Sequence, residues 1–169
     1  MVKINNLSKL KNLKVIKSSF FEDERGTIWT NWERKSFKIN FNHDKFSFSK
    51  KNVLRGFHGD RKTWKLISCV YGEVYFVVVN YDITSREYLK HQSFELSSKN
   101  KLQVLVPPNF LNAHLCISKE CLFHYKLSYR GKYNDRNKQI SVNCKDPRLK
   151  IKWPIKNVIL SKRDFLQND

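Results

Sequence analysis

Short apolar segments alternate with polar turns along most of the chain, and almost none has the spacing of an amphipathic helix. Residues 64–70 and 73–81 are two such segments, and Tyr71-Gly72 separates them. Two strand-like segments around a glycine turn are typical of a β-hairpin. The second segment is apolar almost throughout, which predicts a strand covered on both faces.

The N-terminal half adds further elements. Residues 20–32 predict two strands around an acidic turn, and the polar, amphipathic segment 33–40 predicts a short helix. In residues 41–51, Phe46 and Phe48 occupy alternate positions, which is the period of a half-buried strand. Strands are also predicted at residues 12–19 and 53–57.

The C-terminal half continues the same pattern. Residues 91–96 and 102–106 predict two strands around a turn at 97–101, and residues 115–118 are expected to pair with 121–129 across Lys119-Glu120. The tail, 146–169, contains the stretch LSKRDF, which predicts a last turn or a short helix.

About ten short strands at regular spacing predict an all-β fold, a β-sandwich or jelly-roll barrel. The 169 residues are expected to form a single domain, 1–169, with a core of its own. Hydrophobic residues make up 40% of the chain and aromatic residues 14%, which excludes a disordered protein and favours strands.

The formal net charge of +18 suggests an anionic partner. The basic residues are scattered, however, and no run of five or more occurs. This pattern favours a solvated lysine surface that contains a local functional patch. We therefore expect no nucleic-acid partner, with a basic nucleic-acid binder kept as a lesser alternative.

The four cysteines form no CxxC motif, and three of them lie in apolar segments. Reduced thiols in the core, and hence a cytoplasmic location, are expected. The N-terminus has no unbroken apolar stretch typical of a signal peptide, and no segment approaches the length of a membrane span. No membrane partner is expected.

Most catalytic motifs are missing from the sequence. No HxH pair occurs to build the metal site of a jelly roll, so we expect no metal. No GxSxG, Walker-type or Rossmann-type glycine motif occurs either. Proton transfer remains, because His58 lies beside Arg55, with Lys65 in an apolar segment and several tyrosines elsewhere. A structural role for His58 stays open at this point.

Ordered sequence motifs reveal a family resemblance. The run SKKNVLRGFH is followed in order by WKL, YGEVY and LSSKNKLQVLVPPNF, with FFEDERG before it and FHYKLSY, DPRLKIKWP and LSKRD after it. This order, over roughly residues 15–166, resembles the cupin-fold nucleotide-sugar epimerases typified by dTDP-4-dehydrorhamnose 3,5-epimerase. The resemblance implies a cupin-type jelly roll, a homodimer, a nucleoside-diphosphate 4-keto sugar as substrate, and no cofactor.

The resemblance also implies roles for individual residues. His58 of RGFH resembles the family's base, Asp164 of LSKRD the carboxylate that orients it, and Lys65 the cation that stabilises the enolate. Tyr133 is the expected acid, with Tyr129 as the alternative. The expected substrate contacts are Arg55, Glu24 in DERG, and Arg25, which in the family reaches the diphosphate from the neighbouring subunit.

Several positions depart from the pattern of the rhamnose enzymes. Asp60 stands where those enzymes have glutamine, Asn112 replaces a histidine, and His114 replaces an aromatic residue. Lys45, with Phe46, stands where asparagine and histidine are usual. These positions are expected to line or flank the sugar and base pockets, so the substrate is expected to differ. The variant resembles the epimerases of capsular pathways that act on GDP-linked 4-keto-heptoses. Epimerisation at C3 alone and a non-catalytic sugar-binding protein remain alternatives.

Overall fold

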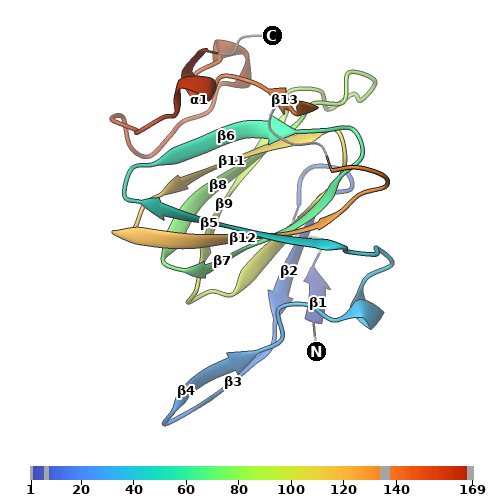
Figure 1. Ribbon diagram of the computed structural model, residues 1–169, viewed down its shortest axis with the longest axis vertical. Coiled ribbons are helices and arrows are strands. Elements are labelled where there is room, and N and C mark those ends of the chain that lie inside the picture. The colour runs from blue at the N-terminus through green and yellow to red at the C-terminus, as the bar shows by residue number, and fades with distance from the viewer. Residues whose placement is uncertain (1, 6–7, 134–137, 167–169) are drawn as a thin grey trace.

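Two sheets face each other in the computed structural model, which describes residues 2–5, 8–133 and 138–166 (Figure 1). The strands of the first sheet are β1 (Val2–Asn5), β2 (Lys14–Ser18), β5 (His43–Lys50), β7 (Trp64–Tyr71), β10 (Leu102–Val106) and β12 (Glu120–Ser128). Those of the second are β6 (Leu54–Gly59), β8 (Glu73–Asn80), β9 (His91–Ser97), β11 (Phe110–Cys116) and β13 (Ile140–Ser141). A separate hairpin and three short helices complete the described elements: β3 (Phe20–Asp23), β4 (Gly26–Trp29), η1 (Arg34–Ser36), η3 (Pro147–Leu149) and α1 (Lys162–Leu166).

Strands that follow each other in the chain often lie in different sheets. In the described residues, the six-stranded sheet has the order β1-β2-β10-β7-β12-β5, and the five-stranded sheet has the order β13-β6-β11-β8-β9. The predicted jelly roll is therefore confirmed, and so are the hairpin at 20–32, which is β3–β4, and the short helix in LSKRDF, which is α1.

Two predicted strand pairings are wrong. β7 and β8 do not form a hairpin: β7 pairs with β10 and β12, whereas β8 pairs with β9 and β11. β11 and β12 likewise belong to different sheets. The two strands predicted around the turn at 97–101 are present as β9 and β10, and they too lie in different sheets. A tight turn between two apolar strands is compatible with a hairpin or with a crossing between sheets. The local pattern does not tell these apart, because what decides is which neighbour buries each strand.

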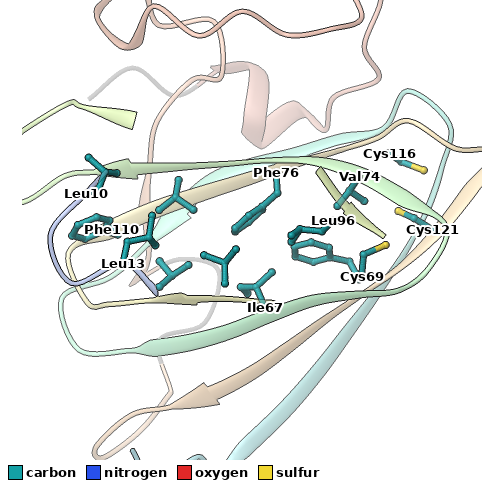
Figure 2. Close-up of a cluster of buried hydrophobic side chains, with 14 residues drawn as sticks. Leu10, Leu13, Ile67, Cys69, Val74, Phe76, Leu96, Phe110, Cys116 and Cys121 are labelled. Carbon is teal, nitrogen blue, oxygen red and sulfur yellow. The ribbon is translucent and has the colours of Figure 1, made fainter. Parts of the chain in front are cut away.

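The space between the sheets is filled by apolar side chains from both of them. Ile67 comes from the six-stranded sheet, and Val74, Phe76 and Leu96 come from the five-stranded sheet (Figure 2). Phe123 of the six-stranded sheet belongs to the same cluster. The free thiols of Cys69, Cys116 and Cys121 lie at one end of this cluster (Figure 2). Burial of this apolar surface is the main force that holds the sheets together.

The outer faces of both sheets are partly covered as well. Val77 and Val79 of β8 pack outward against the C-terminal segment, which contributes Val142, Leu149 and Trp153. β8 is thus covered on both faces, as predicted. This C-terminal segment crosses the five-stranded sheet, and α1 lies beside β6 (Figure 1).

The segment after the β3–β4 hairpin covers part of the other sheet. The short helix predicted at 33–40 is only the three-residue η1, and Phe37 is buried against the outer face of the six-stranded sheet. Phe46 and Phe48 do not form a buried face of β5, because they are 55% and 51% exposed. Their alternation is real, but the inward face of β5 carries the polar side chains instead.

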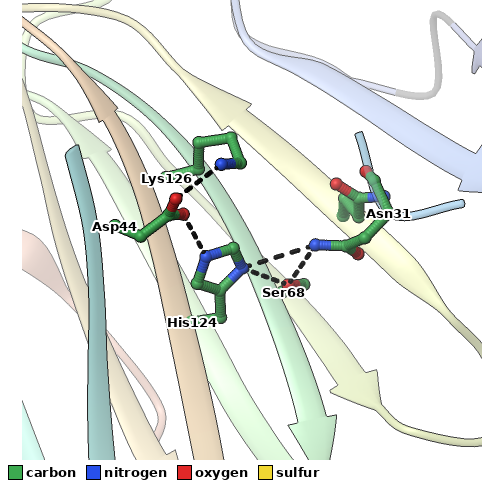
Figure 3. A network of polar contacts seen from close by, with 6 residues as sticks. Asn31, Asp44, Ser68, His124 and Lys126 are labelled. Atoms are coloured by element: carbon green, nitrogen blue, oxygen red, sulfur yellow. Dashed lines mark hydrogen bonds and ion pairs between the residues drawn. The ribbon is translucent and has the colours of Figure 1, made fainter. Parts of the chain in front are cut away.

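A polar network fixes the base of the hairpin to this sheet (Figure 3). The Nδ2 atom of Asn31 lies 3.3 Å from Nδ1 of the buried His124 and 3.5 Å from Oγ of Ser68. Nε2 of His124 lies 2.7 Å from Oδ1 of Asp44, and Nζ of Lys126 donates to Oδ2 of the same carboxylate at 2.7 Å.

In the described part of the chain, no helix is both long and apolar enough to cross a bilayer.

Candidate active site

A cavity of about 330 Å³ opens between the two sheets. Strands β5, β6, β7, β11 and β12 contribute to its walls, and the segment that ends in α1 closes it on one side. The described residues that line it are Lys45, Ser47, Arg55, His58, Lys65, Asn112, Tyr125, Leu127, Tyr133, Gln139, Ser161, Arg163 and Asp164.

A β-bulge brings two of the predicted site residues to the same wall. His58 lies opposite Asn112 of β11, but Arg55, three residues earlier, lies opposite His114, only two residues later. Side chains three residues apart on a regular strand lie on opposite faces. The extra residue in β6 lets Arg55 and His58 face the same cavity. Gly56 makes this possible, because its φ is +118° and a Cβ there would lie 2.6 Å from the carbonyl oxygen of Asn112.

His58 is held from two sides. Its Nε2 lies 2.7 Å from Oδ1 of the buried Asp164, and its Nδ1 lies 3.0 Å from Oγ of Ser141. Nη2 of Arg163 donates to the same Oγ at 2.6 Å, and Ser161 donates to Oδ2 of Asp164 at 2.9 Å. Burial opposes the ionisation of Asp164, but contacts with His58, Ser161 and Arg163 outweigh it and keep the pKa of Asp164 below its ordinary value.

Lys65 carries its charge into the cavity from β7. Its side chain is buried, and Nζ donates to the carbonyl oxygen of His58 at 3.1 Å and to Oδ1 of Asn112 at 2.7 Å. Burial lowers the pKa of Lys65 to about 8, and the carboxylate of Asp60 acts in the opposite direction. An ammonium group has three N–H donors. One of them is therefore left over from these two bonds for a ligand in the cavity.

Tyr133 lies in the same cavity. Its hydroxyl accepts a hydrogen bond from Nε2 of Gln139 at 3.2 Å, and its ring stacks on His43 with 5.2 Å between the ring centroids. Burial raises the pKa of Tyr133, which keeps the hydroxyl protonated. The alternative acid, Tyr129, does not line the cavity in the described residues; its hydroxyl lies 3.4 Å from Nδ1 of His43.

Four of the predicted contact residues lie outside the cavity of this chain. Asp60 is buried, and its Oδ1 accepts the backbone N–H groups of the following turn. His114 is also buried and stacks on Phe123, with 4.0 Å between the ring centroids. Burial lowers the pKa of His114 to about 3, so it is neutral. Glu24 and Arg25 are exposed on the β3–β4 hairpin. The remaining predicted contacts, Lys45, Arg55 and Asn112, do line the cavity.

The sequence analysis missed several residues in or beside this cavity, among them Arg163, Tyr125 and Ser141. Arg163 immediately precedes Asp164 in LSKRD, so its place in that run was the available signal. Tyr125 has a hydroxyl 3.4 Å from Nδ1 of His114, and it stood in a run of alternating residues without a distinguishing feature. Ser141 lies directly opposite His58 in the β13–β6 pair, a long-range register that no local sequence pattern indicates.

The electrostatics of the cavity favour an anionic ligand. Lys45, Arg55, Lys65 and Arg163 all line it, whereas Asp164 is the one carboxylate among the described lining residues, and it contacts His58. Within the described part of the chain, no group of three or more histidine, cysteine, aspartate or glutamate side chains is arranged to hold a metal ion. The arrangement provides an oriented imidazole, a buried cation and a protonated phenol around one cavity, as proton transfer requires.

Comparisons with known proteins agree with this chemistry. Residues 8–168 match the family model described as dTDP-4-dehydrorhamnose 3,5-epimerase. The enzyme of that name from Shigella flexneri is 30% identical over 168 residues, which cover 94% of this chain and 91% of the relative.

Two solved structures are similar throughout. The dTDP-6-deoxy-D-glucose-3,5-epimerase of Legionella pneumophila Philadelphia 1, in complex with dTDP-4-keto-L-rhamnose, has a TM-score of 0.89 and 31% identity, covering 97% of this chain and 90% of its own. The dTDP-4-dehydrorhamnose 3,5-epimerase of Elizabethkingia anophelis NUHP1 has a TM-score of 0.86 and 34% identity, covering 96% of this chain and 93% of its own.

Proposed function

The chain belongs to the dTDP-4-dehydrorhamnose 3,5-epimerase family and is an isomerase, and we propose that it inverts C3, C5 or both in a nucleoside-diphosphate-linked 4-keto sugar, with His58 as the base. The observation that carries this proposal is the ion-pair contact of His58 with Asp164 in a cavity that also holds Lys65 and Tyr133. A proton on the carbon beside a ketone is acidic because the resulting carbanion delocalises onto the ketone oxygen as an enolate.

The residues divide the proton transfer between them. Nε2 of His58 is engaged by Asp164, so Nδ1, once released by the Ser141 hydroxyl when the sugar binds, takes the proton from the sugar carbon, and the C–H electrons move into the enolate. Asp164 stabilises the imidazolium that forms. The ammonium of Lys65 stabilises the enolate oxygen. Tyr133 returns a proton to the opposite face of the carbon, and solvent then restores the protonation states of both side chains.

The cationic side chains of the cavity can bind the diphosphate of the substrate. Lys45, Arg55 and Arg163 line the cavity together with the reacting groups, and each can bind a diphosphate oxygen. The relative from Legionella binds a nucleotide-linked 4-keto sugar. No metal or other cofactor takes part in the proposed reaction.

The preferred substrate is a GDP-linked 4-keto-heptose, with a dTDP-linked 4-keto-6-deoxyhexose as the alternative. Asn112 lines the cavity beside Lys65, and Lys45 lies with its Nζ 5.8 Å from the centre of the Tyr133 ring. Both residues depart from the rhamnose pattern, and both can contact the ligand.

The product would serve capsule or other surface polysaccharide biosynthesis in the cytoplasm, where the four buried cysteines would stay reduced.

The β3–β4 hairpin is proposed to complete the site in a homodimer. It projects away from the two sheets (Figure 1), and Phe21 and Ile28 on it are 62% and 71% exposed. A hairpin with so much exposed apolar surface needs a partner surface. Docking on a second copy would carry Arg25 toward the partner's cavity. Sedimentation should give a dimer for the wild type and a monomer for Ile28→Asp.

Solvent exchange tests the catalytic proposal. The wild-type enzyme, incubated in deuterated water with GDP- and dTDP-linked 4-keto sugars, should incorporate deuterium at C3, C5 or both, as seen by mass spectrometry of the product. His58→Ala should abolish incorporation while its circular dichroism spectrum stays that of the wild type. Thermal stabilisation by these sugars without any exchange would instead indicate a binding protein.

A further inference from the structure

The charge of Lys65 lacks a direct ion pair among the described residues. Its side chain is only 7% exposed, and its two hydrogen-bond acceptors, the carbonyl oxygen of His58 and the amide oxygen of Asn112, are both neutral. A buried ammonium without a counter-ion tends to lose its proton. A neutral Lys65 could not stabilise an enolate, so another group must favour its charged form.

The other charged groups around the cavity do not favour the charged form of Lys65. Lys45 on β5, Arg55 on β6 and Arg163 on α1 are cations, and they disfavour a further positive charge. Asp164, the one lining carboxylate among the described residues, lies at Nε2 of His58. The remaining ionisable groups, His58 itself, Tyr125 and Tyr133, are not anions when they act as base or as protonated phenols.

Asp60 does not line the cavity; it lies in the turn between β6 and β7. It is 3% exposed, and its Oδ1 accepts the backbone N–H groups of Lys62 at 2.9 Å and Thr63 at 2.8 Å. Its Oδ2 is buried and has no hydrogen-bond partner among the described residues. A buried carboxylate oxygen without a donor is costly unless a nearby positive charge compensates for it.

We propose that Asp60 is the counter-ion of Lys65, a positioning residue that keeps the enolate-stabilising ammonium charged without touching the substrate. The inference rests on the proposed function. Supporting it, the Asp60 carboxylate opposes the lowering of the Lys65 pKa by burial. It also raises the pKa of Tyr133, so one anion favours the protonated form of both groups.

Asp60→Asn tests this inference, because the amide oxygen can still accept both backbone hydrogen bonds of the turn and only the charge is lost. The wild type should lose exchange activity as pH rises through about 8, when Lys65 loses its proton. Removing the anion destabilises the ammonium, so this alkaline limb should move toward acid by roughly one pH unit. Asp82→Asn is the matched control, because Asp82 also caps a turn through Oδ1, in the 81–90 loop.

The titration of Lys65 itself, followed by NMR with labelled lysine in the ligand-free protein, separates this inference from the proposed function. A titration midpoint that falls in Asp60→Asn but not in Asp82→Asn supports the inference, even if no 4-keto sugar undergoes exchange. An unchanged midpoint overturns it, even if exchange is fast. If Asp60→Asn does not fold, isotope-edited infrared spectroscopy of the wild type decides: an ionised Asp60 at pH 7 supports the counter-ion, and a neutral one overturns it.

Discussion

Nε2 of His58 on β6 lies 2.7 Å from Oδ1 of Asp164 on α1, so the C-terminal segment supplies the carboxylate that engages the proposed base. This contact engages one nitrogen of the imidazole, and the other, Nδ1, lies 3.0 Å from Oγ of Ser141. It also makes Asp164 important for both catalysis and stability, and the two roles can be measured separately.

Asp164→Asn should reduce solvent exchange at least about a hundredfold, because the imidazolium loses the carboxylate that stabilises it. The exchange rate with a 4-keto nucleotide sugar is the measurement, and a matching loss of affinity for the nucleoside diphosphate is not expected. Near-normal exchange in Asp164→Asn would show that His58 works without its carboxylate.

The same substitution should flatten the acid branch of the stability curve. The folded-state pKa of Asp164 lies below its ordinary value of 3.8, so its contacts stabilise the fold above that value. This stabilisation is lost as pH falls below 3.8 through the folded-state pKa. The Tm of the wild type should therefore fall more steeply than that of Asp164→Asn between about pH 5 and about pH 2. Parallel curves would contradict the assignment.

Tyr133→Phe should separate proton removal from inversion. His58 can still remove and return a proton on its own face, so deuterium should enter the substrate, whereas formation of the inverted product should fall by about a hundredfold or more. Chromatography of the products together with mass spectrometry measures both. Tyr129→Phe is the control and should keep both activities. Loss of inversion in Tyr129→Phe alone would transfer the acid role to Tyr129.

The fold class was predictable from the sequence because alternation and turns are local signals. β3–β4 and α1 were predicted for that reason. The partners of β7 and β8 were not, because Tyr71-Gly72 fits a hairpin and a crossing between sheets equally well. The polarity of β5 was misjudged because exposed phenylalanines at positions 46 and 48 have the same period as buried ones.

The candidate site, like the fold, was predicted only in part from the sequence. His58, Lys65 and Asp164 were predicted from motifs and lie around one cavity. Asp60 was expected to contact the substrate, but it does not line the cavity, because its carboxylate binds the backbone N–H groups of the turn that follows it. Ser141 was missed because its position depends on the β13–β6 register, which pairs it with His58 across 83 residues of sequence.

Ser141→Ala should slow exchange by about tenfold, because His58 loses the hydroxyl that holds Nδ1 in place. The effect should appear in kcat with KM nearly unchanged, since Ser141 holds the base and does not line the cavity in the described residues. Ser141→Thr keeps the hydroxyl and should restore most of the rate. Equal rates in Ser141→Ala and the wild type would mean that Asp164 alone orients the ring.

Gly56→Ala should destabilise the fold by about 3 kcal/mol, because the methyl group would press on the backbone of β11 and the residue would keep a strained φ. A Cβ at Gly56 would lie 2.6 Å from the carbonyl oxygen of Asn112 and 2.8 Å from Cα of Ala113, and φ is +118°. Gly26→Ala is the matched control, since Gly26 has a φ of +120° but nothing within 4 Å of its Cβ position. Urea unfolding of both variants separates the steric cost from the cost of φ.

The bulge at Gly56 turns both Arg55 and His58 toward the cavity. Any Gly56→Ala protein that folds should therefore also lose exchange activity, whereas Gly26→Ala should lose no activity through this strand. Equal destabilisation in the two variants would contradict the close approach of β6 to β11.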